Sequence, residues 1–305
     1  MKKFLMGSLL LVGCGSSGES PFIDGFDPRE PADDEIQIVA PAVKGILPGQ
    51  DITLCSYIDD RILEETDIID YQAFQSAVGA HHAILYSVTQ QQAANTHECN
   101  EDDMLNARYL AGGGADTPPA DLPSGVVFRM PANTQLLIQT HWINATDVPI
   151  DGQSAFNLKI TKPKPEHLTA QLFAIGNTMF TLPLGHGTAS SECTVGKKMN
   201  VFTLAGHMHE WGKHAKIALT PVASAAESVI WESNWSSEYQ FNPPRNNYPT
   251  EAPLVLSPGD KLRIDCEYDN DTGAQLPFPS EMCIGFAYGY PMTEQINCLD
   301  GSWPQ

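Results

Sequence analysis

Two histidines separated by one residue stand in an otherwise apolar stretch, VFTLAGHMHEW at 201–211. Successive side chains of a β-strand point to opposite faces, so a strand here would place His207 and His209 on one face and Met208 on the other. Two adjacent imidazoles are unusual on a strand face that packs against a hydrophobic core. The pattern therefore indicates a metal site, which other residues must complete.

Other histidines have spacings that fit the same use. His141 lies in the predicted strand TQLLIQTHWI, where it shares a face with Gln139. His81 and His82 open the predicted strand HHAILYSV, and adjacent strand residues face opposite ways. Both could bind one metal only at a strand end or a β-bulge, where the alternation fails. Gly79, just before them, favours such a start.

The methionines help to choose the metal. Imidazole suits copper, zinc, iron and nickel, whereas thioether sulfur selects copper, above all Cu(I). Met282 stands beside Cys283, so a disulfide could hold it in place. A single histidine is more often a satisfied, partly buried polar residue, and a single methionine is more often a core filler. The HxH, HH and QxH patterns together in one chain reverse that balance.

These residues must be positioned by a chain that consists mostly of predicted strands, separated by Pro, Gly, Asn and Asp. Long helical periodicity is absent, and one short helix is expected near residues 71–78. The sequence KPKP at 162–165 interrupts the strands and predicts a boundary between an N-terminal domain, 36–162, and a C-terminal domain, 163–305. Each side contains a similar proline turn followed by a strand that ends in Asn, which hints at two related β-sandwiches.

The first residues have the composition of an export signal, with two lysines, an apolar run and small residues before Cys14. Leu-Val-Gly-Cys at 11–14 resembles a bacterial lipobox, which implies removal of residues 1–13 and a lipid on Cys14. The next residue is not Asp, which favours the outer membrane of a Gram-negative cell envelope. An ordinary secretory signal with an incidental cysteine is the alternative. The acidic segment at 14–35 is expected to be a tether.

The 305 residues carry a formal net charge of −20, which argues against nucleic acid or an anionic membrane surface as a partner. Contact with a membrane is expected through the lipid anchor only. Besides Cys14, an even number of cysteines remains, and in an exported chain this indicates disulfides. They are Cys55, Cys99, Cys193, Cys266, Cys283 and Cys298. Their number alone leaves the pairing open.

Several motifs, in chain order, resemble those of the copper type II, ascorbate-dependent monooxygenases, the family of the peptidylglycine α-hydroxylating and dopamine β-monooxygenases. They are His81-His82, Gln139-x-His141, His207-x-His209 and Glu281-Met282-Cys283. The similarity extends over about residues 35–300 and includes the spacing from Cys55 to the HH pair and the segment Trp211-Gly212-Lys213. It implies an all-β fold of two jelly-roll-like antiparallel β-sandwich domains, each with one mononuclear copper.

The resemblance also implies roles for single residues. One copper would be held by His81, His82 and His141, and the other by His207, His209 and Met282. Gln139 matches a glutamine near the histidine-only copper and is a candidate catalytic residue together with His207, His209 and Met282. The implied disulfides are Cys55–Cys99, Cys193–Cys298 and Cys266–Cys283.

The implied activity is that of an oxidoreductase, which hydroxylates an sp3 C–H bond of a small organic substrate with O2. Each Cu(I) supplies one of the two electrons needed beyond those of the substrate, and ascorbate or another one-electron reductant replaces them. Three protein ligands leave an open position for O2 on the methionine-bearing copper, as in other catalytic metal sites. The all-histidine copper stores the second electron.

Two positions depart from the peptide-amidating members of that family. Those members carry an Arg two residues before HxH that binds a substrate carboxylate, and a Tyr four residues after the ligand Met. This chain has Ala205 and Phe286 there, which favours an apolar or neutral substrate. A non-catalytic copper protein for storage, delivery or sensing is the first alternative, and a metal-free β-sandwich interaction protein is the second. His186 and His214 match no ligand and are expected at the surface or beside a site.

Overall fold

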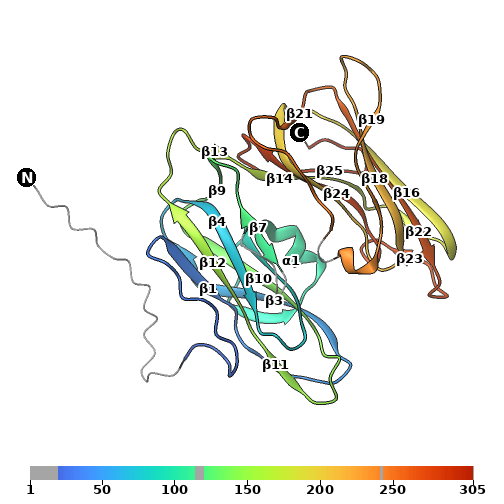
Figure 1. Ribbon diagram of the computed structural model, residues 1–305. Helices are drawn as coiled ribbons and strands as arrows, with labels where there is room; N and C mark the ends of the chain where they lie inside the picture. Colours follow the sequence, from blue (N-terminus) through green and yellow to red (C-terminus); the bar gives the residue numbers. More distant parts are fainter. Residues whose placement is uncertain (1–19, 114–119, 241–242, 305) are drawn as a thin grey trace, which may run out of the picture.

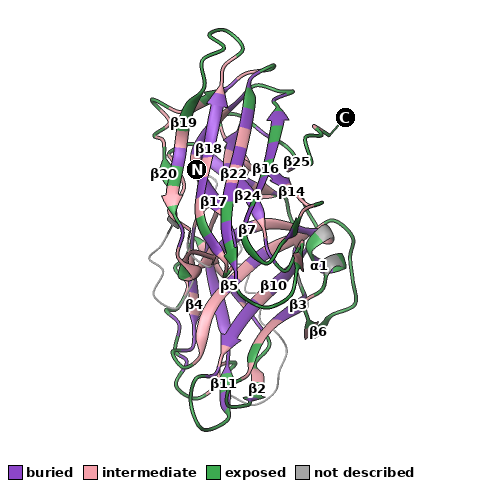
Figure 2. Ribbon diagram, turned by 90° about the vertical axis from the view of Figure 1, so that its right-hand side faces the viewer, coloured by how far each residue is buried: buried purple, intermediate pink, exposed green. Residues whose placement is uncertain are grey.

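The strands of this chain form two sets of mostly antiparallel sheets, one from each half of the sequence (Figure 1). A computed structural model describes residues 20–113, 120–240 and 243–304. Within them the protein is all-β, with two jelly-roll-like β-sandwiches, as the sequence predicts. The buried residues lie along the inner faces of both sandwiches, as Figure 2 shows.

The N-terminal sandwich consists of two large sheets and one small sheet. The first sheet has the order β1 (Glu35–Val39), β12 (Ser154–Thr161), β4 (Thr66–Gln75), β9 (Val126–Met130) and β13 (Leu168–Thr169), and β8 (Ala120–Asp121) pairs with β4. The second has the order β6 (Asn95–Glu98), β3 (Asp51–Ile62), β10 (Thr134–Ile143), β5 (Ala80–Val88) and β7 (Ala107–Gly113). The small sheet pairs β2 (Val43–Ile46) with β11 (Ile150–Gly152). Ile68, Leu85, Ile138 and Phe156 fill the space between the large sheets.

The C-terminal sandwich repeats this plan. One sheet has the order β20 (Asn246–Asn247), β17 (Met199–His207), β24 (Cys283–Tyr290), β14 (Gln171–Asn177) and β25 (Ile296–Leu299), and β21 (Leu254–Leu256) pairs with β17. The facing sheet has the order β16 (Gly185–Thr194), β22 (Lys261–Asn270), β18 (Gly212–Thr220) and β19 (Ser228–Asn234). Two short strands, β15 (Thr181–Leu182) and β23 (Leu276–Pro277), form a small sheet, and η1 (Ser237–Gln240) is a 3-10 turn. Phe173, Ile217, Trp231 and Ile264 are buried between the large sheets.

The short helix expected near 71–78 is wrong, because Tyr71 to Gln75 belong to strand β4. Tyr71, Ala73 and Gln75 are buried while the residues between them are less so, a period of two that fits a strand and not a helix. The helix of this sandwich is α1 (Glu101–Asn106), whose N-terminus is closed by a capping box between Asn100 and Asp103.

The chain changes from the N-terminal to the C-terminal sheets between Thr169 and Gln171, because β13 still pairs with β9. This lies a few residues after the boundary predicted at 162–163. At the other end, part of the predicted tether lies against the N-terminal sandwich. Gln153 donates to the carbonyl of Pro21 and accepts from the backbone of Ile23. Residues 1–13 and Cys14 lie outside the described residues.

Three disulfides join the strands: Cys55–Cys99, Cys193–Cys298 and Cys266–Cys283. This is the pairing that the resemblance implies, and each bond lies within one sandwich. None of the helices in the described ranges has the length and apolar character needed to span a bilayer.

The two sandwiches meet along an aromatic seam. Phe202 and Tyr290, from the C-terminal sheets, belong to the buried cluster of the N-terminal sandwich. The ring of Tyr288 lies 5.6 Å from that of Tyr109 and 5.5 Å from that of Phe128. The seam fixes how the edge of one sandwich lies against the other.

Candidate metal centres

A β-bulge brings three histidines together on the N-terminal sandwich. His82 lies opposite His141 in the pairing of β5 with β10, and Ala80 lies opposite Trp142. His81 is therefore the extra residue of a bulge, where the strict alternation of faces fails. This local irregularity is what allows two adjacent histidines to face the same partner.

The three imidazoles form a compact group. The ring of His141 lies 4.8 Å from that of His81 and 5.0 Å from that of His82, measured between ring centroids. One nitrogen from each ring lies within 4.8 Å of the others. Nitrogens that bind one ion at about 2.0–2.1 Å lie no more than about 4 Å apart, so small side-chain rotations would suit these rings to a single ion.

The electrostatics of this group favour metal-binding forms of the rings. Burial, followed by the charge of His141, lowers the pKa of His81 to about 4. The same two causes, with a further effect of His81, lower the pKa of His82 to about 3. Both rings are therefore neutral at pH 7, which is the protonation state that ligates metals. The carboxylate of Asp51 accepts a hydrogen bond from Nε2 of His141 at 2.6 Å.

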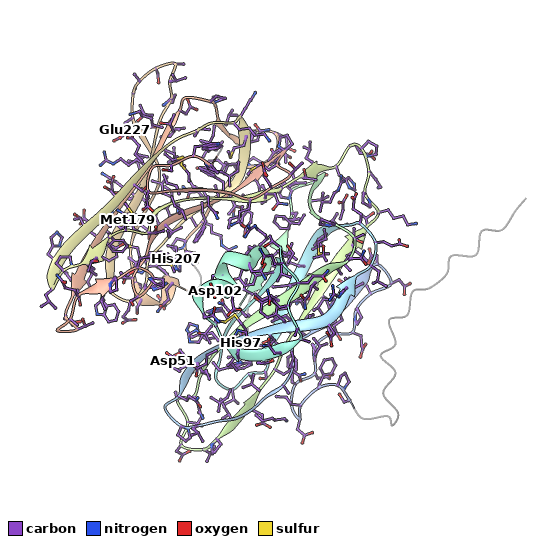
Figure 3. The ribbon with its side chains drawn as sticks, turned by 180° about the vertical axis from the view of Figure 1, so that it is seen from behind. Asp51, His97, Asp102, Met179, His207 and Glu227 are labelled. Carbon is purple, nitrogen blue, oxygen red and sulfur yellow. A yellow bond between two sulfur atoms is a disulfide. The ribbon has the colours of Figure 1, made fainter. Side chains whose placement is uncertain are left out.

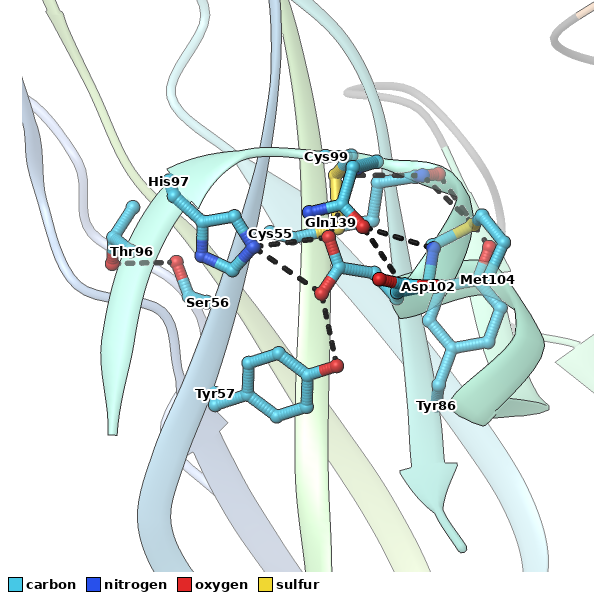
Figure 4. Close-up of a disulfide and its surroundings, with 12 residues drawn as sticks. Cys55, Ser56, Tyr57, Tyr86, Thr96, His97, Cys99, Asp102, Met104 and Gln139 are labelled. Carbon is cyan, nitrogen blue, oxygen red and sulfur yellow. Dashed lines mark hydrogen bonds and ion pairs between the residues drawn. A yellow bond between two sulfur atoms is a disulfide. The ribbon is translucent and has the colours of Figure 1, made fainter. Parts of the chain in front are cut away.

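Gln139 lies beside the Cys55–Cys99 disulfide (Figure 4). Its Nε2 lies 3.8 Å from Sγ of Cys99 and 3.6 Å from Sδ of Met104, and its Oε1 accepts from the hydroxyl of Tyr86 at 3.5 Å. An interaction with Gln139 also acts to raise the pKa of His82, against the effect of burial. Gln139 thus lies between the Cys55–Cys99 bond and His82, one of the three histidines.

A second group lies on the C-terminal sandwich. Strand β17 ends at His207, two residues earlier than predicted, and His207 lies opposite Ile284 of β24. Met282 directly precedes β24, so strand alternation places it on the face of Ile284, which is the face that carries His207. The rings of His207 and His209 lie 5.1 Å apart. Burial, followed by the charges of His209 and His82, lowers the pKa of His207 to about 3.

A buried carboxylate joins the two segments of this second group. Glu281 is fully buried, and its carboxylate accepts hydrogen bonds from the backbone N–H groups of His209, Trp211 and Met282. Burial raises the pKa of Glu281, and the backbone donors act in the opposite direction. The hydroxyl of Tyr268 donates to the carbonyl of Met282 at 2.7 Å. The segment that carries Met282 is thereby fixed from both sides.

The remaining candidates lie elsewhere. Met208 is fully buried in the core of the C-terminal sandwich, on the side away from the two imidazoles. His186 is exposed and lies 3.6 Å from Asp269, and His214 of β18 forms a 2.9 Å contact with Glu232 of the neighbouring strand β19. These two histidines stay apart from both groups.

The two groups face each other across the junction of the sandwiches. The charge of His82 affects His207, so the two rings lie close enough to interact. In Figure 3, His207 lies on the side of its sandwich that faces Asp51 and Asp102 of the N-terminal half. The fold therefore brings the three histidines of the N-terminal sandwich toward the His207–His209 pair of the C-terminal sandwich.

The surface beside His207 is largely apolar. Ala205 lies opposite Phe286, and the ring of Phe286 lies 5.8 Å from that of His207. On the other side, β20 pairs Asn246 with Leu204, so the exposed Arg245 precedes it next to Ala205. The charge of Arg245 acts on Tyr71, Tyr109 and Tyr288 at the junction of the sandwiches.

Two residues of these groups were not assigned a role from the sequence. Asp51 lies 90 positions from His141, and only the pairing of β3 with β10 brings them together. Glu281 belongs to a quoted motif, but its function as an acceptor for the loop after β17 depends on tertiary structure. A local signal for Glu281 exists, since an acidic residue just before a buried strand is unusual.

Comparison with known proteins gives distant relatives. No known family model matches. The chain is 25% identical over 240 residues to the peptidyl-glycine alpha-amidating monooxygenase of Mus musculus and 24% identical over 240 residues to that of Rattus norvegicus. It is 22% identical over 239 residues to form B of Xenopus laevis. These alignments cover 73–74% of this chain but 23–26% of the relatives, so the chain spans about a quarter of their length.

Among solved structures, the major capsid protein P2 of bacteriophage PM2 superposes with a TM-score of 0.38 at 7% identity, over 84% of this chain and 97% of that chain. A triple jelly-roll protein of an archaeal virus superposes with a TM-score of 0.24 at 8% identity, over 86% of this chain and 60% of that chain. The sequence relatives are the informative comparison. The chain is distantly similar to the peptidylglycine alpha-amidating monooxygenases over about three quarters of its length.

Proposed function

We propose that this protein is a copper-dependent monooxygenase that hydroxylates an sp3 C–H bond of a small organic substrate with O2 and an external one-electron reductant, such as ascorbate. The observation that carries the proposal is the pair of facing groups. His81, His82 and His141 gather at a bulge of one sandwich, and His207 and His209 meet at a strand end of the other. The distant similarity to monooxygenases supports the same reading.

Each group has the donors for one copper. The three histidines of the N-terminal group would hold one ion, and His207, His209 and Met282 would hold the other. When bound, copper would supply one electron from each site and activate O2 at the methionine-bearing site. The thioether of Met282 favours Cu(I), the form that meets O2. Gln139 steadies His82, and Glu281 holds His209 and Met282 at a constant spacing.

The surroundings of His207 bear on the substrate. Ala205 and Phe286 offer an apolar wall, which suits a neutral or apolar molecule. Arg245 lies at the edge of that wall, so a carboxylate-bearing substrate belongs in the same panel of tests. The substrate would bind between the two sandwiches, next to the proposed methionine-bearing copper site.

The test is oxygen uptake by the copper-loaded, reduced protein against a panel of amines, amides, carboxylates and hydrocarbons, with analysis of the products. We expect one hydroxylated product per O2 consumed with at least one class. The matched control is His214→Ala, which removes a histidine outside both groups and should leave the uptake unchanged.

A non-catalytic copper protein for storage or delivery is the second candidate, and the replacement of a substrate-binding arginine by Ala205 favours it. The same experiment separates the two. Binding of two coppers without substrate-dependent oxygen uptake across the whole panel would establish the second candidate and refute the first.

We also propose that the protein is anchored in the bacterial cell envelope by a lipid on Cys14, in the outer membrane, and that its large negative net charge keeps it off anionic surfaces. Mass spectrometry of the mature N-terminus checks this. A soluble wild-type chain with an unmodified N-terminus would contradict it, and Cys14→Ala should leave an unlipidated precursor.

A further inference from the structure

Asp51 stands at the rim of the all-histidine group. It is the first residue of β3, and the pairing with β10 sets it opposite Ile143, two residues from His141. Its side chain is 66% exposed, whereas that of His141 is 8% exposed. A solvent-facing carboxylate is thus in contact with a buried ring.

The contact determines which nitrogen of His141 faces the other histidines. An ionised carboxylate can only accept, so Nε2 of His141 carries the proton and donates it to Asp51 at 2.6 Å. The other nitrogen, Nδ1, keeps its lone pair and is the one left for a ligand. Histidines that bind metals commonly donate their second nitrogen to a carboxylate, which fixes the ring and strengthens it as a ligand.

The charge of Asp51 extends beyond this one hydrogen bond. It acts on His81 as well as on His141, so two of the three rings lie within its field. A negative charge near a metal stabilises a doubly charged ion more than a singly charged one, since the Coulomb energy scales with the ionic charge. Asp51 therefore favours Cu(II) over Cu(I) in the N-terminal group.

The C-terminal group has different neighbours. Nδ1 of His209 faces the neutral carbonyl of Ser280 at 3.1 Å, and the third candidate ligand is the thioether of Met282. The carboxylate of Glu281 is engaged by three backbone N–H groups, and its charge also acts on His209. Thioether ligation favours Cu(I), whereas the N-terminal group has a third imidazole in place of the thioether.

We propose that Asp51 is a positioning residue that orients His141 and would lower the reduction potential of a copper held by the all-histidine group. The proposal rests on the proposed function, because it concerns the ion that this group would hold. The external reductant would supply the electron stored there.

Three variants separate orientation from charge. Asp51→Asn keeps an oxygen that can accept from Nε2 of His141 but removes the charge. Asp51→Ala removes both, and Asp51→Glu retains both functions. The matched control is Asp269→Asn, which neutralises another exposed aspartate beside a histidine, His186, outside both groups. All four changes lie on exposed side chains, so folding should be retained.

The affinities are measured in a His207→Ala, His209→Ala background, in which only the all-histidine site loads. Competition with chelators gives the Cu(II) and Cu(I) affinities separately. We expect Asp51→Ala to weaken Cu(II) binding by about 10–100-fold. Asp51→Asn should weaken Cu(II) binding more than Cu(I) binding, which is a rise in reduction potential. Asp51→Glu and Asp269→Asn should bind both ions as the background protein does.

Nitrogen-15 NMR of the copper-free protein gives an independent readout of the ring. We expect the proton of His141 on Nε2 in the parent protein and in Asp51→Asn, and a mixture of tautomers in Asp51→Ala. Equal losses of Cu(I) and Cu(II) affinity in Asp51→Asn would refute the role in the potential. An unchanged tautomer in Asp51→Ala would refute the role in orientation. A parent protein that takes up no copper at this site would instead refute the proposed function.

Discussion

At the scale of single residues, the two methionines near the HxH pair have opposite environments. Met208 is fully buried in the core of the C-terminal sandwich, whereas Met282 is half-buried and follows Glu281, which binds the backbone of His209. The strand alternation that separates Met208 from its histidine neighbours also explains why the sequence neighbour is the poorer candidate ligand.

Met282→Ala should remove the sulfur scatterer seen by X-ray absorption of the reduced, copper-loaded protein, because thioether ligation favours Cu(I). It should also abolish turnover while the all-histidine site stays loaded. Met208→Ala should keep the sulfur signal and cost stability, about 2–5 kcal/mol for a buried methionine cut to alanine. Loss of the sulfur signal in Met208→Ala, rather than in Met282→Ala, would show that Met282 is not the sulfur ligand.

The sequence predicted these side chains better than it predicted their supports. His81 and His82 were expected to need a strand end or bulge, and the structure has a bulge at His81. Asp51 could not be found in this way, because its contact with His141 depends on the register between strands that are far apart in sequence. Local patterns reveal which face a residue occupies, and tertiary pairing decides what lies next to it.

At the scale of elements, the disulfide Cys266–Cys283 joins β22 to the start of β24, directly after Met282. Tyr268 of β22 donates to the carbonyl of Met282. The covalent bond and the hydrogen bond thus hold the same short segment against one strand. The Cys55–Cys99 bond has a comparable place next to Gln139 in the other sandwich.

Replacing Cys266 and Cys283 by alanine should therefore loosen the segment that carries Met282 and weaken copper binding at the methionine site more than at the all-histidine site. Chelator competition on both sites is the measurement. The matched change, Cys55 and Cys99 to alanine, should weaken copper binding at the all-histidine site more than at the methionine site. Equal effects of the two double variants on both sites would show that the bonds act on overall stability alone.

A buried ion pair joins other elements of the N-terminal sandwich. Asp67 of β4 is fully buried, with hydrogen bonds to Arg129 of β9 at 2.7 and 2.9 Å and to Nδ1 of His167 at 2.7 Å. Burial alone would raise the pKa of Asp67, but the hydrogen bonds and charges of Arg129 and His167 outweigh it and lower the pKa. The folded state therefore binds this proton less readily than the unfolded chain.

Asp67→Asn should lower the free energy of unfolding at pH 7 by about 1–3 kcal/mol, because it leaves Arg129 and His167 without their anionic partner. A lowered pKa stabilises the fold above the ordinary value of about 4 and ceases to do so as the pH falls through the folded-state value. The difference between parent and variant should therefore shrink in acid. Urea unfolding at pH 7 and pH 3 measures it.

The control for this prediction is Asp34→Asn, because Asp34 forms an exposed pair with Lys159 at 3.5 Å. Exposed pairs contribute little, so this variant should unfold like the parent at both pH values. A constant difference between parent and Asp67→Asn from pH 7 to pH 3 would contradict the charge-based account.

Strand prediction succeeded where apolar residues alternate or run together, as in β10 and β24. The hydrophobic signal is weak in β16, whose buried positions are small residues such as Gly187, Ala189 and Ser191. In β4, bulky and polar residues follow one another closely enough to imitate a helical period near Tyr71. Burial in that strand depends on two neighbouring strands, which a local window does not include.

At the scale of the whole molecule, both sandwiches are needed for the proposed chemistry. The aromatic seam of Phe202, Tyr288 and Tyr290 packs C-terminal strands onto the N-terminal core. Because β24 carries Tyr288 and also begins just after Met282, the seam links the orientation of the domains to that of the second group. The proposed function therefore requires both sandwiches of one chain.

The parent protein should bind two coppers per chain, and His141→Ala and Met282→Ala should each retain the copper of the other group. Pre-reduced His141→Ala should lose multiple turnover for want of the stored electron, and Met282→Ala should form no product.

An equimolar mixture of these variants should remain inactive, because the two groups of one pair lie in the same chain and face each other. Product formation under steady reduction, compared with a mixture of His214→Ala and parent protein, measures this. Parent-like turnover by the mixed variants would show that electrons pass between molecules, and a parent protein that saturates at one copper would remove the basis for pairing the two sites.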